Sequence, residues 1–180
     1  MKKLPRDFYD RDTQQVAKAL LGKQLVHQQK VGRIVEVEAY LGPHDLAAHS
    51  ARGLTKRTAV MFGPPGHAYV YLIYGMYHCM NVVTEPEGHA SAVLIRALEP
   101  LQAIGQRTQG PGLLCQAMAI SRAQNAVDLV TDPHFFIANA PAVPSEDIVA
   151  KPRIGVDYAG EWKDSPLRFY IKGNRFVSKR

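Results

Sequence analysis

The chain has 180 residues, of which 46% are hydrophobic and 21% charged, a composition that is ordinary for a globular protein and excludes fibrous and disordered classes. A chain of this length predicts one domain, residues 1–180, with a sizeable hydrophobic core. The formal net charge of +6 at pH 7 favours a polyanionic partner such as nucleic acid, although solubility alone also explains it.

Membrane and secreted classes are not expected. No apolar run reaches the roughly 18–20 residues that a membrane helix needs, and the N-terminus MKKLPRDFYD turns acidic without an apolar core. Two cysteines, Cys79 and Cys115, are too few for a disulfide framework. We therefore expect a reducing intracellular compartment, the cytoplasm.

The first third of the chain predicts one helix and one long strand. A helix is expected over residues 12–22, because its ends carry a capping residue and a glycine. Residues 31–41, VGRIVEVEAYL, alternate like a strand and are rich in β-branched side chains. A loop follows over residues 42–56, and FGPPG at 62–66 is a turn that no helix or central strand can pass through.

The remainder is dominated by strands. Two strands flank Gly75, and another covers residues 91–100, where its last residue, a proline, is expected to end it. A helix is expected over residues 112–125, and the segments 153–158 and 167–173 look like strands. The fold class predicted is mixed α/β (α+β), a single compact domain on a curved, largely antiparallel sheet with a protruding β-hairpin and flanking helices.

Two glutamates lie on one face of the strand at 31–41. Alternation places Ile34, Glu36, Glu38 and Tyr40 on that face, and apolar side chains on the other. The two glutamates have two interpretations: the wet side of a solvated sheet edge, or a catalytic carboxylate at the rim of a pocket.

Four of the eight tyrosines crowd into YVYLIYGMYHCMN, residues 69–81. A turn at the central glycine would make a hairpin with Tyr74 at or near its tip. Packing in an aromatic core would explain Tyr69, but a residue at a tip does not pack easily into its own core. On a basic protein, such a protruding aromatic group suggests a wedge between base steps. Tyr40 and Tyr71 could then form flat walls of a pocket for a planar ring.

Arg96 lies inside an apolar strand, where an unpaired charge is costly. The sequence suggests a pairing with Glu36 or Glu38. Such a pair is either an internal salt bridge or part of a functional site.

A loop with the sequence GPHDLAAHS adds His44, Asp45 and His49 to the acidic strand and invites a metal site. The spacing of the two histidines fits no standard helical pair, and the chain has no HExxH motif or cysteine cluster. A histidine on a loop more often donates a hydrogen bond or stacks on a ligand. A metal-dependent hydrolase is therefore retained only as an alternative.

Five stretches together resemble the alkyladenine (3-methyladenine) DNA glycosylase family, in the family's order and with similar gaps. They are RIVEVEAYLGPHDLAAHS, MFGPPGHAYVYLIYGMYHCMNVV, LIRALEP, LCQAMAI and GEWKDSPLRFY, and they run from about residue 33 to residue 170. The chain looks like a bacterial member resembling the mammalian methylpurine DNA glycosylase. The loop at 51–60 looks shorter than in the mammalian pattern, and the turn at 84–90 looks longer. These departures leave open the preference among 3-methyladenine, 7-methylguanine, hypoxanthine and ethenoadenine.

The resemblance implies roles for the residues of the expected pocket. Glu38 matches the general base that activates water, and Arg96 matches the arginine that helps to hold this water. The side chains matching those that sandwich an extruded base are Tyr40, His49 and Tyr71.

Further matches concern discrimination between bases and the DNA duplex. Asn81 matches an asparagine that discourages normal guanine, and Leu94 matches an apolar packing residue beneath the site. Tyr74 matches the intercalating residue that fills the vacated space. Met76 and Tyr77 match residues near this wedge in the minor groove.

By this resemblance the chain is expected to be a single DNA glycosylase domain, monofunctional and acting in base excision repair. It would flip alkylated or deaminated purines out of the duplex and leave an abasic site. The expected partner is double-stranded DNA containing a damaged purine, bound by a monomer at the nucleoid, with no membrane, metal or organic cofactor implied. The alternatives are a non-catalytic module that kinks DNA and the metal-dependent hydrolase.

Overall fold

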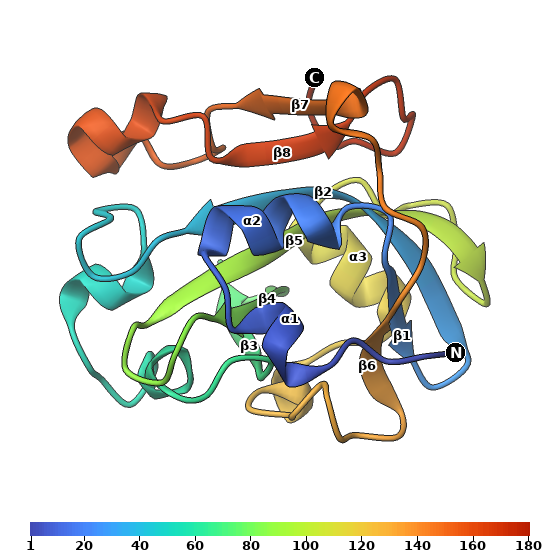
Figure 1. The fold of residues 1–180 in the computed structure, drawn as a ribbon, viewed down its shortest axis with the longest axis horizontal. Coiled ribbons are helices and arrows are strands. Elements are labelled where there is room, and N and C mark those ends of the chain that lie inside the picture. The colour runs from blue at the N-terminus through green and yellow to red at the C-terminus, as the bar shows by residue number, and fades with distance from the viewer.

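One antiparallel sheet of eight strands frames the fold (Figure 1), and the computed structural model describes all residues, 1–180. The strands are β1 Gln24–His27, β2 Lys30–Tyr40, β3 Ala68–Ile73, β4 Tyr77–Thr84, β5 Ser91–Gln102, β6 Phe135–Ala138, β7 Ile148–Lys151 and β8 Arg168–Ile171. Their main order is β3-β4-β5-β2-β1-β6. The predicted fold class, a mixed α/β domain on a curved antiparallel sheet, is confirmed.

The long strand β2 organises the sheet. It pairs with β5 along one edge, while its other edge pairs first with β1 and then with β8. The strand β7 pairs only with β8, so the two C-terminal strands extend the sheet from β2 towards the top of Figure 1. Two strands, β6 and β7, lie within residues 133–152, a stretch that contains several prolines and for which no element was expected from the sequence.

Two register shifts between β2 and β5 decide which side chains meet. Ile34 pairs with Leu98 and Glu36 with Ala97, so Val35 has no partner on β5. The next pair is Val37 with Ile95, which leaves Arg96 without a partner on β2. Paired bulges of this kind redirect side chains. Ile34 and Val35 accordingly both belong to the hydrophobic core, although strict alternation predicted Ile34 beside the glutamates.

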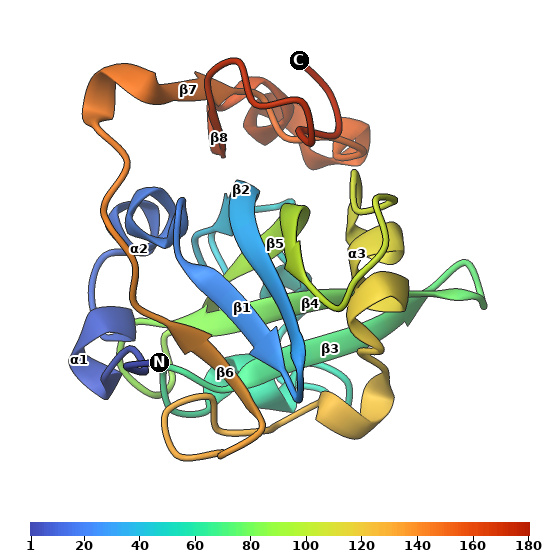
Figure 2. The same cartoon turned by 90° about the vertical axis from the view of Figure 1, so that its right-hand side faces the viewer.

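Helices cover both sides of the sheet. The helices are α1 Arg6–Tyr9, α2 Thr13–Leu20 and α3 Pro111–Met118, and Figure 2 shows α2 and α3 on opposite sides of β1, β2 and β5. The helix predicted at 12–22 is confirmed: the Asp12 side chain accepts a hydrogen bond from the Gln15 amide, and Gly22 follows the helix with φ +85°. None of the helices reaches the length and apolar character needed to span a lipid bilayer.

The hairpin of β3 and β4 projects away from the rest of the molecule on the side of α3 (Figure 2). At its tip Tyr74 and Gly75 have φ values of +53° and +66°, and the Met76 amide donates to the Ile73 carbonyl. Two successive residues with positive φ match the right-handed twist of a hairpin. The predicted hairpin with a tyrosine at its tip is therefore confirmed.

Two predicted element ends are wrong for local reasons. Strand β5 continues through Pro100 to Gln102, because β4 pairs with β5 only as far as Leu94, so the missing amide faces an unpaired edge. Helix α3 ends at Met118 rather than near residue 125, because Ala119 adopts a left-handed conformation with φ +56°.

The predicted strand at 153–158 is also wrong. Gly155 has φ +74°, which interrupts an extended chain, and 3₁₀ turns follow over Asp157–Asp164. The 3₁₀ turns elsewhere are His49–Arg52, Ala59–Phe62, Arg122–Gln124 and Ser145–Asp147.

Candidate active site

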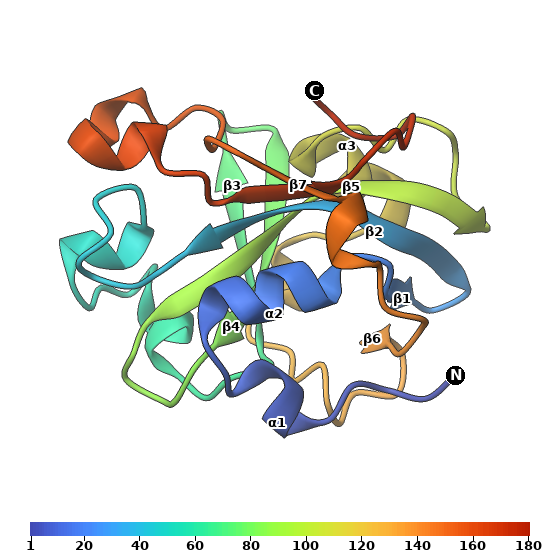
Figure 3. The ribbon, with the colours of Figure 1, turned by 45° about the horizontal axis from the view of Figure 1, so that its top comes forward.

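A cavity of about 1090 Å³ lies against the hairpin. Its walls come from β2 to β5, the loop after β2, the start of α3 and the segment 154–158. The loop after β2 and the turns at 157–164 lie at the same end of β2 in Figure 3. Nine of the ten site residues expected from the sequence line this cavity, and Met76 is the exception.

Glu38 is the one acidic side chain on the cavity wall. Its carboxylate is fully buried in the fold and accepts hydrogen bonds from the Tyr40 hydroxyl at 2.8 Å and from the Ile154 amide at 2.8 Å. Each bond goes to a different oxygen, and Oε1 also faces Arg96 Nη1 at 3.3 Å, so Oε2 keeps a lone pair for another donor. The carboxylate is thus held in a fixed orientation at the cavity wall.

Glu36 is equally buried but does not line the cavity. It accepts hydrogen bonds from the Arg168 guanidinium at 2.9 Å and from the Ser178 amide at 2.7 Å. The interpretation of the two glutamates as a solvated sheet edge is therefore wrong. Only one of the pair faces the cavity.

Arg96 lies between the two glutamates. Its Nε is 3.5 Å from Glu36 Oε1 and its Nη1 is 3.3 Å from Glu38 Oε1, so the expected pairing is confirmed for both partners. Arg96 lines the cavity, and its buried Nε makes no hydrogen bond. The unbonded Nε thus lies on the side of Glu36, and Nη1 is the atom that faces the carboxylate of Glu38.

Several aromatic rings form part of the cavity wall. The rings of His49 and Tyr71 lie 4.6 Å apart at 62°, and Tyr69 lies 5.3 Å from Tyr71. The Tyr69 hydroxyl is 3.0 Å from His49 Nδ1, and Tyr69 is only 2% exposed, which agrees with its expected place in the core. Tyr40 contributes a separate ring from β2.

These aromatic side chains are neutral near pH 7. Burial, aided by the positive charges of Arg57 and Arg52, lowers the pKa of His49 from 6.5 to about 4. Burial, with the Glu38 carboxylate as the next cause, raises the pKa of Tyr40 well above its usual value. The Tyr40 hydroxyl therefore keeps its proton and donates it to Glu38 in a hydrogen bond.

Asn81 and Leu94 face each other as neighbours across β4 and β5, and both line the cavity. The Asn81 amide nitrogen donates to the Tyr69 carbonyl at 3.1 Å, which fixes its orientation. Leu94 is 4% exposed.

The tip of the hairpin is exposed. Tyr74 is 85% exposed and Met76 63% exposed, which is unusual for large apolar side chains. Tyr77, at the start of β4, packs against Gly112 of α3, where an added Cβ would lie 2.7 Å from the ring. The hairpin therefore presents Tyr74 and Met76 outward from a base braced by α3.

Sequence reasoning missed several arginines. Arg52, Arg57 and Arg107 line the cavity, and all three are exposed. The run ARGLTKRTAV carried a signal for two of them, since basic residues gather there. Arg153 was missed altogether, although it is buried and pairs with Asp45 at 2.6 Å.

The structure does not gather the side chains of the suggested metal site. No group of three or more histidine, cysteine, aspartate or glutamate side chains is arranged to hold a metal ion. Asp45 is bound to Arg153, and His44 packs its ring edge-on against Trp162 at 5.7 Å.

Comparison with known proteins defines the class. The sequence pattern of the family described as "Methylpurine-DNA glycosylase (MPG)" matches residues 7–175. A protein of Legionella pneumophila (strain Lens), named "Putative 3-methyladenine DNA glycosylase", is 64% identical over 99% of this chain and 100% of its own length. A protein with the same name from Anaeromyxobacter dehalogenans (strain 2CP-C) is 54% identical over 98% of this chain and 87% of its own length. Another, from Methanocella arvoryzae, is 52% identical over 100% of this chain and 98% of its own length.

A basic cavity with a buried carboxylate, in a chain with these relatives, defines a DNA glycosylase, a hydrolase that acts on N-glycosyl bonds in DNA. The chain belongs to the methylpurine-DNA glycosylase family. The resemblance noted in the sequence is thereby confirmed.

Proposed function

We propose that this protein is a monofunctional glycosylase of base excision repair. It flips an alkylated or deaminated purine out of duplex DNA into the cavity, hydrolyses the N-glycosidic bond and leaves an abasic site. The single observation that carries the proposal is the position of Glu38, a buried carboxylate on the wall of an aromatic cavity beside a protruding hairpin, with a free lone pair on Oε2.

The hydrolytic step requires a base and charge stabilisation. Glu38 takes a proton from a water molecule as the water oxygen forms its bond to C1′ of the sugar. The N-glycosidic bond breaks, and its electron pair leaves with the purine. Positive charge builds on the sugar during this step, and the Glu38 carboxylate stabilises it. Arg96, whose Nη1 lies 3.3 Å from Glu38 Oε1, helps to hold the water.

The aromatic walls bind the extruded base. Tyr40, His49 and Tyr71 offer neutral rings to a purine, and stacking of a base on such a ring contributes about 1–3 kcal/mol. Alkylated purines carry a positive charge and leave as neutral bases. A neutral base such as hypoxanthine has to gain a proton before it leaves. Asn81, fixed by its bond to the Tyr69 carbonyl, discourages normal guanine.

The hairpin supplies the wedge. Extruding a nucleotide costs a few kcal/mol of pairing and stacking, and less at a damaged site. Tyr74 fills the vacated gap and slows the return of the base, while Met76 and Tyr77 lie in the minor groove. The 85% exposure of Tyr74 in the absence of DNA supports this role.

The absence of a suitable amine supports a monofunctional reaction. A lyase forms a Schiff base between an amine and the sugar carbon. None of the 30 residues lining the cavity is a lysine. Strand cleavage is therefore not part of the reaction.

The test uses duplexes that each carry one lesion, either hypoxanthine, ethenoadenine or 7-methylguanine, incubated with the protein in excess EDTA. Strands are then separated on gels with and without treatment in hot alkali. We expect breaks only after alkali, on at least one of these lesions. Tight binding without breaks on any of them would favour the DNA-kinking module, and breaks without alkali would establish a lyase.

A further inference from the structure

The strongest unassigned feature is a buried ion pair behind the cavity. The side chains of Asp45 and Arg153 are both fully buried. Arg153 Nη1 donates to Asp45 Oδ2 at 2.6 Å, and Nη2 donates to Oδ1 at 2.9 Å, so the pair is bidentate. Burying two charges is costly unless the geometry is good and other hydrogen bonds complete it.

Arg153 also contacts the strand that carries the catalytic carboxylate. Its Nη1 donates to the Ala39 carbonyl at 2.9 Å, and its guanidinium lies over the ring of Tyr40, 4.8 Å from the centroid. Arg153 does not line the cavity, whereas Tyr40 does. The guanidinium therefore supports the Tyr40 ring from behind.

Ile154, the residue after Arg153, links the same segment directly to Glu38. The Ile154 amide donates to Glu38 Oε1 at 2.8 Å. The two residues are consecutive, so anchoring the guanidinium of Arg153 restrains the stretch of backbone that carries this amide. One side chain thereby controls a hydrogen bond to Glu38 and the orientation of Tyr40, which itself donates to the other oxygen of Glu38.

Asp45 extends the link to the loop after β2. Its Oδ2 accepts from the Leu41 amide at 3.0 Å and its Oδ1 from the Ala47 amide at 3.1 Å. This loop leads directly into the 3₁₀ turn that begins at His49, another part of the cavity wall. The pair therefore ties together the segments that carry Glu38, Tyr40 and His49.

We infer that Arg153, held by Asp45, is a positioning residue for base excision: it sets Tyr40 and the Ile154 amide against Glu38. This assignment rests on the proposed function. Arg153 is buried and does not line the cavity, so it acts through Tyr40 and Glu38. Lysine in its place keeps the charge but loses the bidentate fork and the planar contact with Tyr40.

The test measures single-turnover excision at saturating enzyme for Arg153→Lys. Displacement of reacting groups by about 1 Å can cost a factor of about 100, so we expect the rate constant to fall between about tenfold and about 100-fold. Affinity for an undamaged duplex should stay the same, because no phosphate contact changes. The control is Arg6→Lys, which alters an Arg–Asp pair of the same 2.6 Å length away from the cavity, and its rate should match the wild type.

A double-mutant cycle separates positioning from lost stability. Both routes from Arg153 end at Glu38, so Arg153→Lys should slow excision much less in a Glu38→Gln background than in the wild type. Thermal unfolding of each variant checks folding. Should Arg153→Lys not fold, Asp45→Asn is taken through the same cycle.

Two results would overturn the assignment: a wild-type rate in Arg153→Lys, or an equal fold-loss in both backgrounds. Either result can occur while the wild type still excises damaged bases, so neither result would contradict the proposed function. Failure of the wild type on every lesion would instead contradict the proposed function itself.

Discussion

At the scale of single residues, the cavity combines one carboxylate with neutral aromatic rings and several arginines. Glu38 is the only acidic side chain on its wall, while Arg52, Arg57, Arg96 and Arg107 give it a positive potential. A positive cavity attracts the DNA backbone, and in the proposed reaction the one fixed carboxylate activates the water. Burial in this cavity, together with the charges of Arg57 and Arg52, lowers the pKa of His49 to about 4.

The depressed pKa of His49 predicts a dependence of stability on pH. Its folded pKa of about 4 lies below the ordinary value of 6.5, so the unfolded chain binds more protons between these values. The free energy of unfolding should therefore fall as the pH is lowered from 7 to 5. Allowing for partial exposure, His49 should contribute about 1 kcal/mol to this fall.

Urea unfolding at pH 7 and pH 5 measures this contribution, as the difference between wild type and His49→Gln. The variant should lose less stability than the wild type between the two pH values. An equal loss would show that His49 is not held neutral by the fold.

At the scale of elements, the hairpin is built for projection rather than for packing. Tyr74 has φ +53°, a conformation that costs a non-glycine residue about 1–2 kcal/mol, and its ring is 85% exposed. The base of the hairpin packs against α3 instead. Tyr77 contacts Gly112 so closely that a Cβ on residue 112 would clash with its ring. Strain at an exposed tip is expected where function, not stability, selects the side chain.

Tyr74→Gly should separate activity from stability. Loss of the wedge should slow single-turnover excision about tenfold or more, because the extruded base returns more readily to the stack. The free energy of unfolding should stay within about 0.5 kcal/mol of the wild type, or rise, because glycine relieves the positive φ. An unchanged excision rate would show that Tyr74 does not fill the gap.

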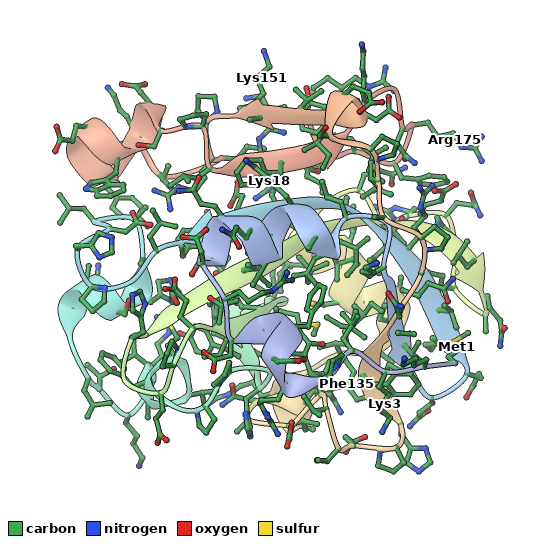
Figure 4. The ribbon with its side chains drawn as sticks, in the orientation of Figure 1. Met1, Lys3, Lys18, Phe135, Lys151 and Arg175 are labelled. Carbon is green, nitrogen blue, oxygen red and sulfur yellow. The ribbon has the colours of Figure 1, made fainter.

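At the scale of the whole molecule, the charge distribution sets how DNA is approached. The net charge is +6, and the cavity rim adds exposed Arg52, Arg57 and Arg107 to the hairpin side. Lys151 of β7 points away from the body of the molecule at the top of Figure 4 and does not line the cavity. The arginines at the cavity rim should therefore affect DNA binding more than Lys151 does.

Binding to an undamaged duplex should weaken as salt rises, because cations displace counterions from the phosphates. Arg107→Ala should reduce the slope of log affinity against log salt concentration by about one. Lys151→Ala should leave the slope unchanged. Fluorescence anisotropy over a salt series gives both slopes, and equal slopes in the two variants would show that the cavity rim does not contact phosphates.

Local patterns predicted much of this molecule. Alternation along 31–41 placed Glu36 and Glu38 on one face, and the family resemblance singled out Glu38. A glycine between two strands indicated the hairpin that carries Tyr74. The register shifts that bury Ile34 with Val35 could not be predicted from the sequence, because they depend on how β2 pairs with β5. The pair of Asp45 and Arg153 could not be found either, because 108 residues separate its members and only the folded chain brings them together.

The most direct measurement of the central claim is single-turnover excision by Glu38→Gln. Glutamine keeps the size of the side chain and can still accept a hydrogen bond from the Ile154 amide or the Tyr40 hydroxyl, but it cannot take a proton from water. On the lesion that the wild type excises best, the rate constant should fall by a factor of about 100 to 10,000, with duplex affinity and thermal stability close to wild type. Glu99→Gln, which alters a partly exposed pair with Arg33, should excise at the wild-type rate. Wild-type excision by a folded Glu38→Gln would contradict the claim that Glu38 activates the water.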